Sequence, residues 1–296
     1  MKENGLVIAR FKNHALIESE SKEQYLCEFH NRRLNPIVGD TISWNKNNEN
    51  TGIIKSIFNR SSYLNRINSK GKPEIIAANL TQLVIVLAET PKPDWLLLDR
   101  YLVAAEICYL KAIIVFNKID LTENLPANFK IYKDLNYDVL AVSAHKNIGT
   151  SNIRHHLKKN RSVIIGQSGV GKSSLMNVLM GDSVQKVGEL SDKAKLGKHT
   201  TTTAILYRLP SGGEIIDFPG ARTYSPYMEN AQQAEHGFRE IKTLRENCRF
   251  NNCHHLDEPD CAIKIALVNK KINIERYKSY KQFYEHTKKI KSRVNN

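Results

Sequence analysis

Gly166-Gln167-Ser168-Gly169-Val170-Gly171-Lys172-Ser173 is the stretch of sequence that decides the fold around it. It matches G-x-x-x-x-G-K-[ST], in which backbone N–H groups and a helix N-terminus surround the phosphates of a nucleotide. An apolar run at 162–165 predicts a buried strand before the loop, and residues 174–180 predict a helix after it. We expect Lys172 to reach the β- and γ-phosphates, the Ser173 hydroxyl to ligate Mg²⁺, and Ser174 to complete the phosphate loop.

A second motif, Asn117-Lys118-Ile119-Asp120, matches N-K-x-D and predicts that the base is guanine. A carboxylate at Asp120 can accept hydrogen bonds from guanine N1–H and the exocyclic amine, a donor pair that adenine lacks. Asn117 is expected either to bond the base edge or to brace the phosphate loop. The stem of Lys118 is expected to lie over the ring, and a backbone N–H of Ser143-Ala144 to reach guanine O6.

A third motif, Asp217-Phe218-Pro219-Gly220, supplies the remaining phosphate contacts. Asp217 would lie on the Mg²⁺ side, and the Gly220 backbone N–H would meet the γ-phosphate. Thr201, in the threonine run 200–203 between the phosphate loop and Asp217, is the expected second Mg²⁺ ligand. The alternative for this run is the β-rich edge of a loop.

The motifs that recognise the base precede those that bind the phosphates, the reverse of Ras-like chains. Breaking a closed domain at a surface loop and joining its old ends keeps the core intact. Residues 70–228 therefore predict a circularly permuted α/β P-loop GTPase domain with a mainly parallel sheet. Strands are expected at 83–87, 112–116, 139–142 and 162–165, with a hairpin over 204–216. A helix is expected over 95–108.

Residues 1–69 predict a small β-barrel of the OB or SH3 type, and we favour OB. Short apolar runs separated by turn formers give five expected strands, at 6–9, 15–17, 25–27, 41–44 and 53–57. Such barrels often bind oligonucleotides, although a purely structural barrel is the alternative. The candidate RNA contacts are Arg32, Arg33, Arg60 and Arg66, and Gly71-Lys72-Pro73 is expected to be a linker.

Residues 229–296 predict a mostly helical domain that holds a metal. Cys248-x4-Cys253-x-His255-x5-Cys261 offers three thiolates and one imidazole, a tetrahedral Zn²⁺ set, with His254 as a competing imidazole. Four protein ligands leave no open position, so the zinc is expected to be structural. The alternative is a loop with three reduced thiols.

The end of the chain is strongly basic. The last 27 residues hold nine Lys or Arg against two Glu, half of the net charge of +14 of the whole chain. Tyr277, Tyr280 and Tyr284 alternate with these lysines, which favours contact with rRNA by phosphate pairing and base stacking. The alternative is a solvated helix whose tyrosines belong to a core stripe.

Composition narrows the class of protein further. The net charge and a pI of about 9.5 favour a polyanionic partner. No apolar run approaches the roughly 18 residues that span a bilayer, and the start, Met1 to Gly5, does not look like a signal peptide. The five cysteines favour a reducing compartment. We expect a cytoplasmic monomer without a membrane partner.

At this point the chain resembles the ribosome-small-subunit-dependent GTPase A family (RsgA), bacterial factors in late small-subunit assembly. The resemblance covers nearly the whole length and rests on four segments: 166–174, 199–202, 217–220 and the cysteine–histidine cluster. It implies that His255 rather than His254 is the zinc ligand. It also implies binding of the small ribosomal subunit and its rRNA, and hydrolysis of GTP to GDP stimulated by that subunit.

Ala221 stands after Gly220, where a water-orienting Gln often lies, so intrinsic hydrolysis should be slow. His199 is a candidate for orienting the water, or else a solvated loop histidine. A second hypothesis remains open for the whole chain. It is an RNA-binding assembly module whose nucleotide site senses GTP or GDP without significant turnover.

Overall fold

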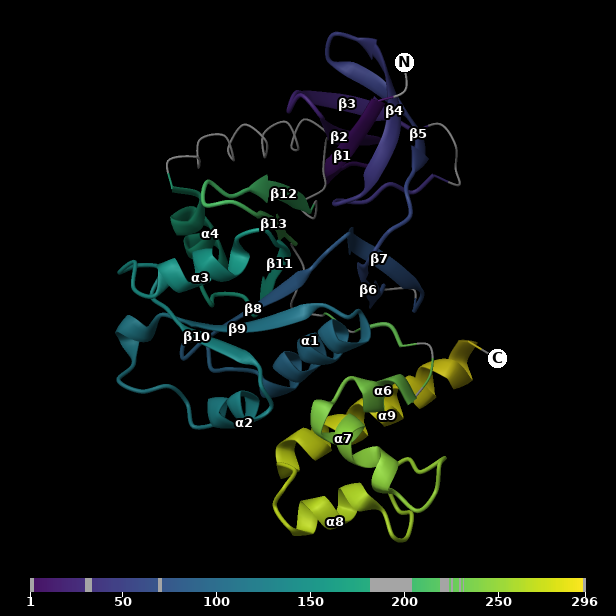
Figure 1. Cartoon of the computed structure of the whole chain (residues 1–296), viewed down its shortest axis with the longest axis vertical. Coiled ribbons are helices and arrows are strands. Elements are labelled where there is room, and N and C mark those ends of the chain that lie inside the picture. Colours follow the sequence, from purple (N-terminus) through teal and green to yellow (C-terminus); the bar gives the residue numbers. More distant parts are fainter. Residues whose placement is uncertain are drawn as a thin grey trace.

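The chain folds into three parts that follow one another in sequence and in space (Figure 1). The computed structural model describes residues 3–29, 34–68, 71–181, 204–218, 224, 226–228, 230 and 232–294, with side chains as far as residue 288. A β-barrel lies at one end, an α/β sheet in the middle, and a group of helices at the other end.

The N-terminal part is a closed barrel with OB topology, as predicted. Its strands are β1 (Glu3–Arg10), β2 (His14–Ser19), β3 (Gln24–Glu28), β4 (Thr41–Asn48) and β5 (Thr51–Ile57). They pair in the order β1-β2-β3-β5-β4, and β1 also pairs with β4, which closes the barrel. The strand alternation directs Ile17, Ile42 and Trp44 into a core where all three are fully buried.

The prediction that Gly71-Lys72-Pro73 is a linker is wrong. Strands β6 (Tyr63–Ile67) and β7 (Pro73–Ala78) form an antiparallel hairpin, and Gly71 lies in its turn. The turn is held by Asn68, whose N–H donates to the carbonyl of Lys72. Pro73 begins β7, where proline removes no ladder bond of a central strand. The sequence boundary at 69/70 thus falls inside this hairpin.

The central part is a six-stranded sheet in the order β10-β9-β8-β11-β13-β12, parallel except for β12. Its strands are β8 (Gln82–Ala88), β9 (Lys111–Asn117), β10 (Asp138–Ala141), β11 (Arg161–Gly166), β12 (Ile205–Arg208) and β13 (Glu214–Asp217). The helices of this part are α1 (Trp95–Ile107), α2 (Phe129–Asp134), α3 (Thr150–Leu157) and α4 (Lys172–Met180). The carboxyl ends of the parallel strands meet at one edge, where ligands of such sheets bind.

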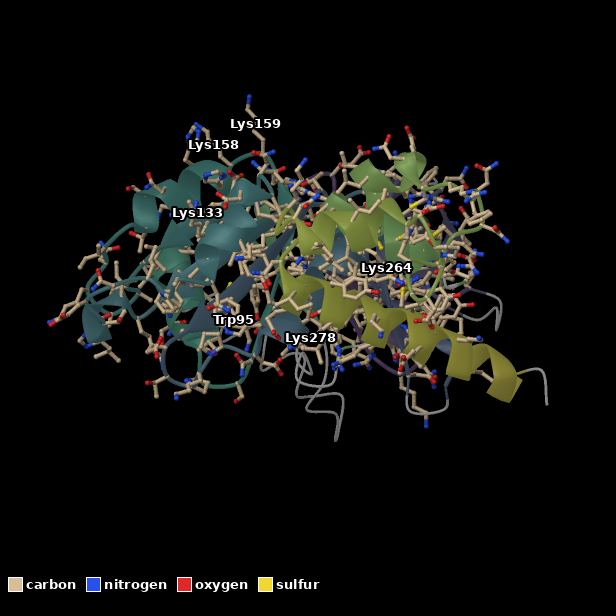
Figure 2. All side chains as sticks on the ribbon, turned by 90° about the horizontal axis from the view of Figure 1, so that it is seen from below. Trp95, Lys133, Lys158, Lys159, Lys264 and Lys278 are labelled. Atoms are coloured by element: carbon tan, nitrogen blue, oxygen red, sulfur yellow. The ribbon has the colours of Figure 1, made fainter. Side chains whose placement is uncertain are left out.

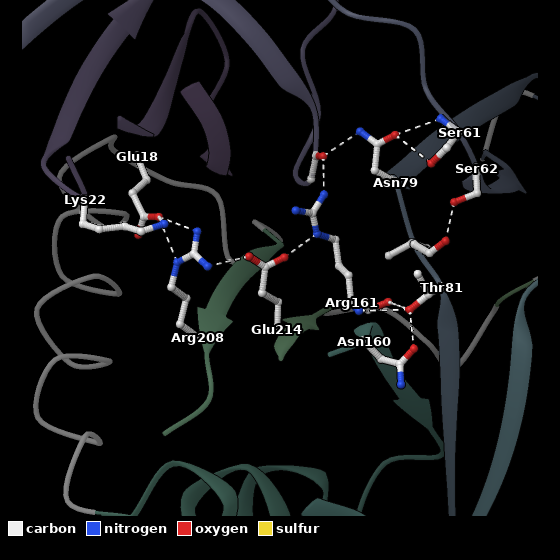
Figure 3. A network of polar contacts seen from close by, with 12 residues as sticks. Glu18, Lys22, Ser61, Ser62, Asn79, Thr81, Asn160, Arg161, Arg208 and Glu214 are labelled. Atoms are coloured by element: carbon white, nitrogen blue, oxygen red, sulfur yellow. Dashed lines mark hydrogen bonds and ion pairs between the residues drawn. The ribbon is translucent and has the colours of Figure 1, made fainter. Parts of the chain in front are cut away.

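The barrel and the central sheet share one polar network (Figure 3). Arg161, the first residue of β11, bonds to Glu214 at 2.5 Å and donates to the carbonyl of Gly39 in the barrel at 2.8 Å. Arg208 of β12 bridges Glu214 and Glu18 of β2. Strand β12 also pairs with β1, so the two sheets are continuous.

The C-terminal part comprises α6 (Gln232–His236), α7 (Arg239–Leu244), α8 (Ala262–Val268) and α9 (Ile274–Val294). Helices α6 and α7 are short, with five and six residues. Gly237 separates them, and a Cβ there would lie 2.6 Å from a methyl of Val103 in α1. Glycine at this position permits the close approach to α1, and the extended backbone of Phe238, with φ of −116° and ψ of 104°, separates the two helices.

Within the described part of the chain, no helix combines the length and the apolar character needed to cross a membrane.

Candidate nucleotide site and metal centre

The phosphate loop joins β11 to α4 and depends on glycine at two positions. Gly166 has φ of +148° and Gly171 has φ of +90°, values that side-chain-bearing residues rarely adopt. A Cβ at Gly166 would collide with the carbonyl of Val86, and one at Gly171 with the side-chain amide of Asn117. Glycine thus lets the loop pass close to β8 and to the N-K-x-D segment.

Lys172 begins α4 with its ammonium over the loop. Its Nζ donates to the carbonyls of Gly166 at 2.8 Å and Gln167 at 2.7 Å. Burial raises the pKa of Asp217, at the end of β13, and the charge of Lys172 counteracts that rise. The cation and the carboxylate therefore face the same space at the edge of the sheet.

Asn117, at the end of β9, ties the two separated halves of the site together. Its amide nitrogen donates to the carbonyl of Val170 at 2.9 Å, and its oxygen accepts from the N–H of Ala144 at 3.0 Å. The residue is 1% exposed, so both bonds are shielded from water. Of the two roles expected for Asn117, the structure displays the bracing of the phosphate loop.

The backbone of Ser143-Ala144 forms hydrogen bonds within the protein. The N–H of Ser143 donates to the carbonyl of Ile148, and that of Ala144 donates to Asn117, so both are already engaged. The hydroxyl of Ser143 bonds Asp120 and is the main reason that the pKa of this carboxylate is lowered. The segment thus positions Asn117 and Asp120, while its expected contact with guanine O6 stays a prediction.

Lys118 crosses from the base motif to the phosphate loop. Its Nζ donates to the carbonyl of Gly169 at 2.6 Å and to that of Thr90 at 2.8 Å. Its backbone has φ of +64°, which turns the chain sharply after β9. Asp120 is exposed just beyond it. The side chain of Lys118 is thus fixed in place, and the ionised carboxylate of Asp120 is exposed two residues further along.

The segment after β8 also holds the phosphate loop, although it carries no recognisable sequence motif. The Gln167 side chain accepts from the N–H of Asp94 at 3.0 Å and donates to the carbonyl of Lys92 at 3.2 Å. The carboxylate of Asp94 accepts from the N–H of Leu97 and so caps α1. The only available signal was position, because this segment follows a buried parallel strand.

Some expected residues lie outside the part of the chain that the structure describes. They are Thr201, His199 and Gly220 of the nucleotide site, and Arg32 and Arg33 of the expected RNA contacts. Of the other arginines, Arg60 is ion-paired with Asp40 at 2.7 Å and Arg66 with Glu74 at 2.9 Å.

The cysteine–histidine cluster comes together in the C-terminal part. The ligand atoms of Cys248, Cys253, His255 and Cys261 all lie within 4.8 Å of one another. His255 Nδ1 is 3.5 Å from the sulfurs of Cys248 and Cys261, which are 3.9 Å apart. With bonds of about 2.3 Å to sulfur and 2.0–2.1 Å to nitrogen, a tetrahedral ion requires edges of about 3.5–3.8 Å. The cluster therefore fits a metal ion with four protein ligands.

Burial raises the pKa of Cys253 to about 12, so a cation is needed to hold this thiol as a thiolate. Two tyrosines of α9 hold the loop that carries His255 by hydrogen bonds to its carbonyls. The hydroxyl of Tyr277 donates to the carbonyl of His255 at 2.6 Å, and that of Tyr280 to the carbonyl of His254 at 2.9 Å.

The prediction that the tyrosines of α9 stack on bases is wrong for Tyr280 and Tyr284. Tyr280 is fully buried and Tyr284 is 6% exposed, so their faces belong to the core of the C-terminal part. The alternative of a core stripe is the one that the structure supports. The surface lysines are also dispersed, since Lys133, Lys158 and Lys159 project from the α/β part and Lys264 and Lys278 from the C-terminal helices (Figure 2).

A P-loop next to N-K-x-D at one sheet edge, in permuted order, defines a circularly permuted GTPase. A model of the RsgA GTPase family matches residues 57–226, and one described as 50S ribosome-binding GTPase matches residues 161–292. The small ribosomal subunit biogenesis GTPase RsgA of Haemophilus influenzae is 36% identical, covering 98% of this chain and 86% of its own. That of Pseudomonas putida is 40% identical, covering 94% and 83% respectively.

The chain belongs to the RsgA family of GTPases. Its fold is similar to the crystal structure of YjeQ from Thermotoga maritima, with a TM-score of 0.76, 28% identity, and coverage of 96% of this chain and 98% of that one. YloQ, described as a circularly permuted GTPase, matches with a TM-score of 0.75 and 25% identity over 98% of this chain and 96% of its own.

Proposed function

We propose that this GTPase binds the small ribosomal subunit, contacts its rRNA and assists its late maturation, hydrolysing GTP to GDP and phosphate. The observation that carries the nucleotide part is the position of Asn117, bonded both to the phosphate loop and to the Ser143-Ala144 segment. The names of the relatives support the ribosomal part.

In this proposal Asp120 selects guanine, with Lys118 over the ring. Residues 166–174 bind the phosphates, with Lys172 on the β- and γ-oxygens. The residues that would hold Mg²⁺ are Ser173 and Thr201, with Asp217 on the same side. The ion would neutralise charge that develops on the phosphate oxygens. Gly220 would donate to the γ-phosphate, and His199 would orient the water.

We assign zinc to the cluster of Cys248, Cys253, His255 and Cys261, because three sulfurs and one imidazole at tetrahedral spacing are typical of structural zinc. We also propose the domain limits 1–69, 70–228 and 229–296, a cytoplasmic location, and a monomer. The high net charge of +14 supports an RNA partner.

The decisive experiment measures GTP turnover by the purified protein with and without small ribosomal subunits. Slow intrinsic hydrolysis and a large stimulation by subunits are expected, because Ala221 replaces a water-orienting residue. Large subunits serve as the control. Absence of stimulation, with tight binding of GTP and GDP retained, would favour the alternative of a nucleotide sensor without significant turnover.

A further inference from the structure

We propose that a hollow between the end of β5 and the β6–β7 hairpin binds an unpaired base of single-stranded RNA. The hollow has a volume of about 390 Å³, and it is lined by Asn35, Ile57, Phe58, Asn59, Arg60, Tyr63 and Ile75. The proposal rests on the proposed function, which supplies an RNA partner. The hollow lies apart from the strand 2–3 face that OB barrels commonly use to bind ligands.

The two aromatic rings are the first reason. Phe58 is 46% exposed and Tyr63 is 42% exposed, although both are large apolar side chains. A single exposed ring needs no explanation, but two exposed rings that line one hollow together with two isoleucines offer a surface for stacking. Bases stack on such platforms whatever their identity, because every base has a π-face.

The polar wall is the second reason, because it is fixed before any ligand arrives. Arg60 donates to both carboxylate oxygens of Asp40, at 2.7 and 2.9 Å, and to the carbonyl of Asn35 at 3.1 Å. The next residue, Ser61, is held by Asn79, whose amide also reaches the carbonyl of Gly39 (Figure 3). A preorganised wall loses little side-chain entropy on binding.

The chemistry of the wall favours a base over a peptide. The side-chain amides of Asn35 and Asn59 offer donors and acceptors together, as the edges of bases require. Among the lining residues that the structure describes there is no carboxylate, so a polyanion meets no repulsion from the wall itself. The net charge of +14 attracts such a chain from solution.

The strand that carries Tyr63 also touches the nucleotide side of the molecule. Two residues further along β6, the carbonyl of Asn65 accepts from the Tyr224 hydroxyl at 2.7 Å. The guanidinium of Arg66 lies 5.2 Å from the ring of Phe218, which follows Asp217. A base bound against Tyr63 would therefore be held by an element in contact with the segment that follows the Mg²⁺-side carboxylate.

The test compares the full-length wild-type protein with Phe58→Ala/Tyr63→Ala, using a fluorescein-labelled 12-nucleotide oligouridine and anisotropy. Loss of a stacked base should weaken binding about tenfold or more, with the salt dependence unchanged because no phosphate contact is removed. Tyr109→Ala is the matched control, since Tyr109 is 93% exposed and lies outside the hollow. Affinity for GDP should be equal in all three proteins.

A second measurement keeps the proposal falsifiable if the double variant folds poorly. The wild-type protein is irradiated with oligouridine containing 5-iodouridine, and adducts at Phe58 or Tyr63 are expected by mass spectrometry. Adducts elsewhere only, or equal affinity of the double variant and Tyr109→Ala, would overturn the proposal and leave a protein segment as the alternative occupant. If subunit-stimulated turnover persists in that case, the proposed function stands and only the site is lost.

Discussion

At the scale of single residues, Asp120 is the group that we propose selects the base. Its carboxylate is exposed and its pKa is lowered by the hydrogen bond from Ser143, so it is ionised at neutral pH. An ionised carboxylate only accepts, whereas an amide accepts with one end and donates with the other. Guanine presents two donors to this position, and xanthine presents one donor and one carbonyl.

We therefore expect Asp120→Asn to lower GTP affinity by about 10- to 100-fold and to raise XTP affinity, because a charge-assisted hydrogen bond is worth about 1.5–3 kcal/mol. Titration with fluorescent GTP and XTP analogues measures both effects. Glu123→Gln is the control, an exposed acid on the same loop. Unchanged preference for GTP in Asp120→Asn would remove Asp120 from base recognition.

A substitution at Gly171 tests the contact between the phosphate loop and Asn117 of the N-K-x-D motif. Asn117 cannot yield to a new Cβ without losing its bonds to Val170 and Ala144. Gly171→Ala should therefore abolish detectable nucleotide binding. Gly212→Ala is the matched control, with φ of +89° against +90° but only an ordinary contact at 3.6 Å.

Both alanine variants carry a similar backbone strain of about 1–2 kcal/mol. Urea unfolding should give the larger loss of stability for Gly171→Ala, because the clash also breaks the buried bonds of Asn117, and calorimetry with GDP measures the loss of nucleotide binding. Equal GDP affinity in both variants would contradict the bridging role of Asn117.

At the scale of elements, α9 depends on the cysteine–histidine cluster. Its Tyr277 and Tyr280 bond the carbonyls of the ligand loop, and Tyr280 packs edge-on against Phe238 at 5.8 Å between ring centroids. The core of this part is small, so a bound ion contributes free energy of folding directly. The cluster therefore fixes the helix as well as the loop.

Elemental analysis of the wild-type protein should give about one zinc per chain. In Cys261→Ser the zinc content should fall strongly, and near-UV circular dichroism should lose the signal of the packed tyrosines. Cys108→Ser is the control, because burial raises the pKa of this thiol to about 11 and it lies outside the cluster. Full zinc content in Cys261→Ser would contradict the ligand assignment.

The elements also differ in how well the sequence predicted them. The barrel strands, β8, β9 and β11 were anticipated because continuous or alternating apolar runs fix their burial. Helices α2 and α3 were not, since each is short and begins without a side-chain cap, α3 at Gly149 with φ of +71°. The β6–β7 hairpin was mistaken for a linker because turn-forming residues join its two short strands.

At the scale of the whole molecule, Arg276 of α9 joins the C-terminal part to the GTPase part. It is 2% exposed and bonds Asp99 of α1 at 2.5 Å and Glu240 of α7 at 2.7 Å. Its guanidinium also lies 4.5 Å from the ring of Phe238. The hydroxyl of Tyr132 donates to Asp99, so α2 belongs to the same network.

Arg276→Met should cost about 3–5 kcal/mol of unfolding free energy, because it leaves two buried carboxylates without a cation. Arg249→Met is the control. Its ion pair with Asp260 is exposed, with side chains 65% and 62% accessible, so removal should cost less than about 1 kcal/mol. Chemical unfolding measures both, and equal losses would contradict a stabilising network.

The unfolding free energy of Arg276→Met is also expected to depend on pH. Burial raises the pKa of Asp99, and in the wild-type protein the charge of Arg276 opposes that rise. Without Arg276 the folded pKa rises further above the unfolded value of about 3.9. The folded state then binds the proton more readily, so stability is retained below the unfolded pKa and lost as the pH rises through the folded pKa.

The deficit of Arg276→Met relative to the wild type should therefore grow as the pH rises above the unfolded pKa of about 3.9. Urea unfolding at several pH values tests this. Replacing Asp99 by Asn in the same protein should flatten the pH dependence. A deficit that is constant with pH would mean that Asp99 stays ionised.

What the sequence determined by itself was a set of local motifs: the phosphate loop, N-K-x-D, the cysteine–histidine cluster and the barrel strands. These are local patterns, in which residue type and spacing follow from one strand, one turn or one ion. Tertiary structure alone decided which partner each group meets. It engaged the N–H of Ala144 with Asn117, bonded the hydroxyl of buried Tyr280 to the carbonyl of His254, and paired Arg276 with Asp99, which lies 177 residues away. Such pairings depend on the packing of distant segments, and no local spacing encodes them.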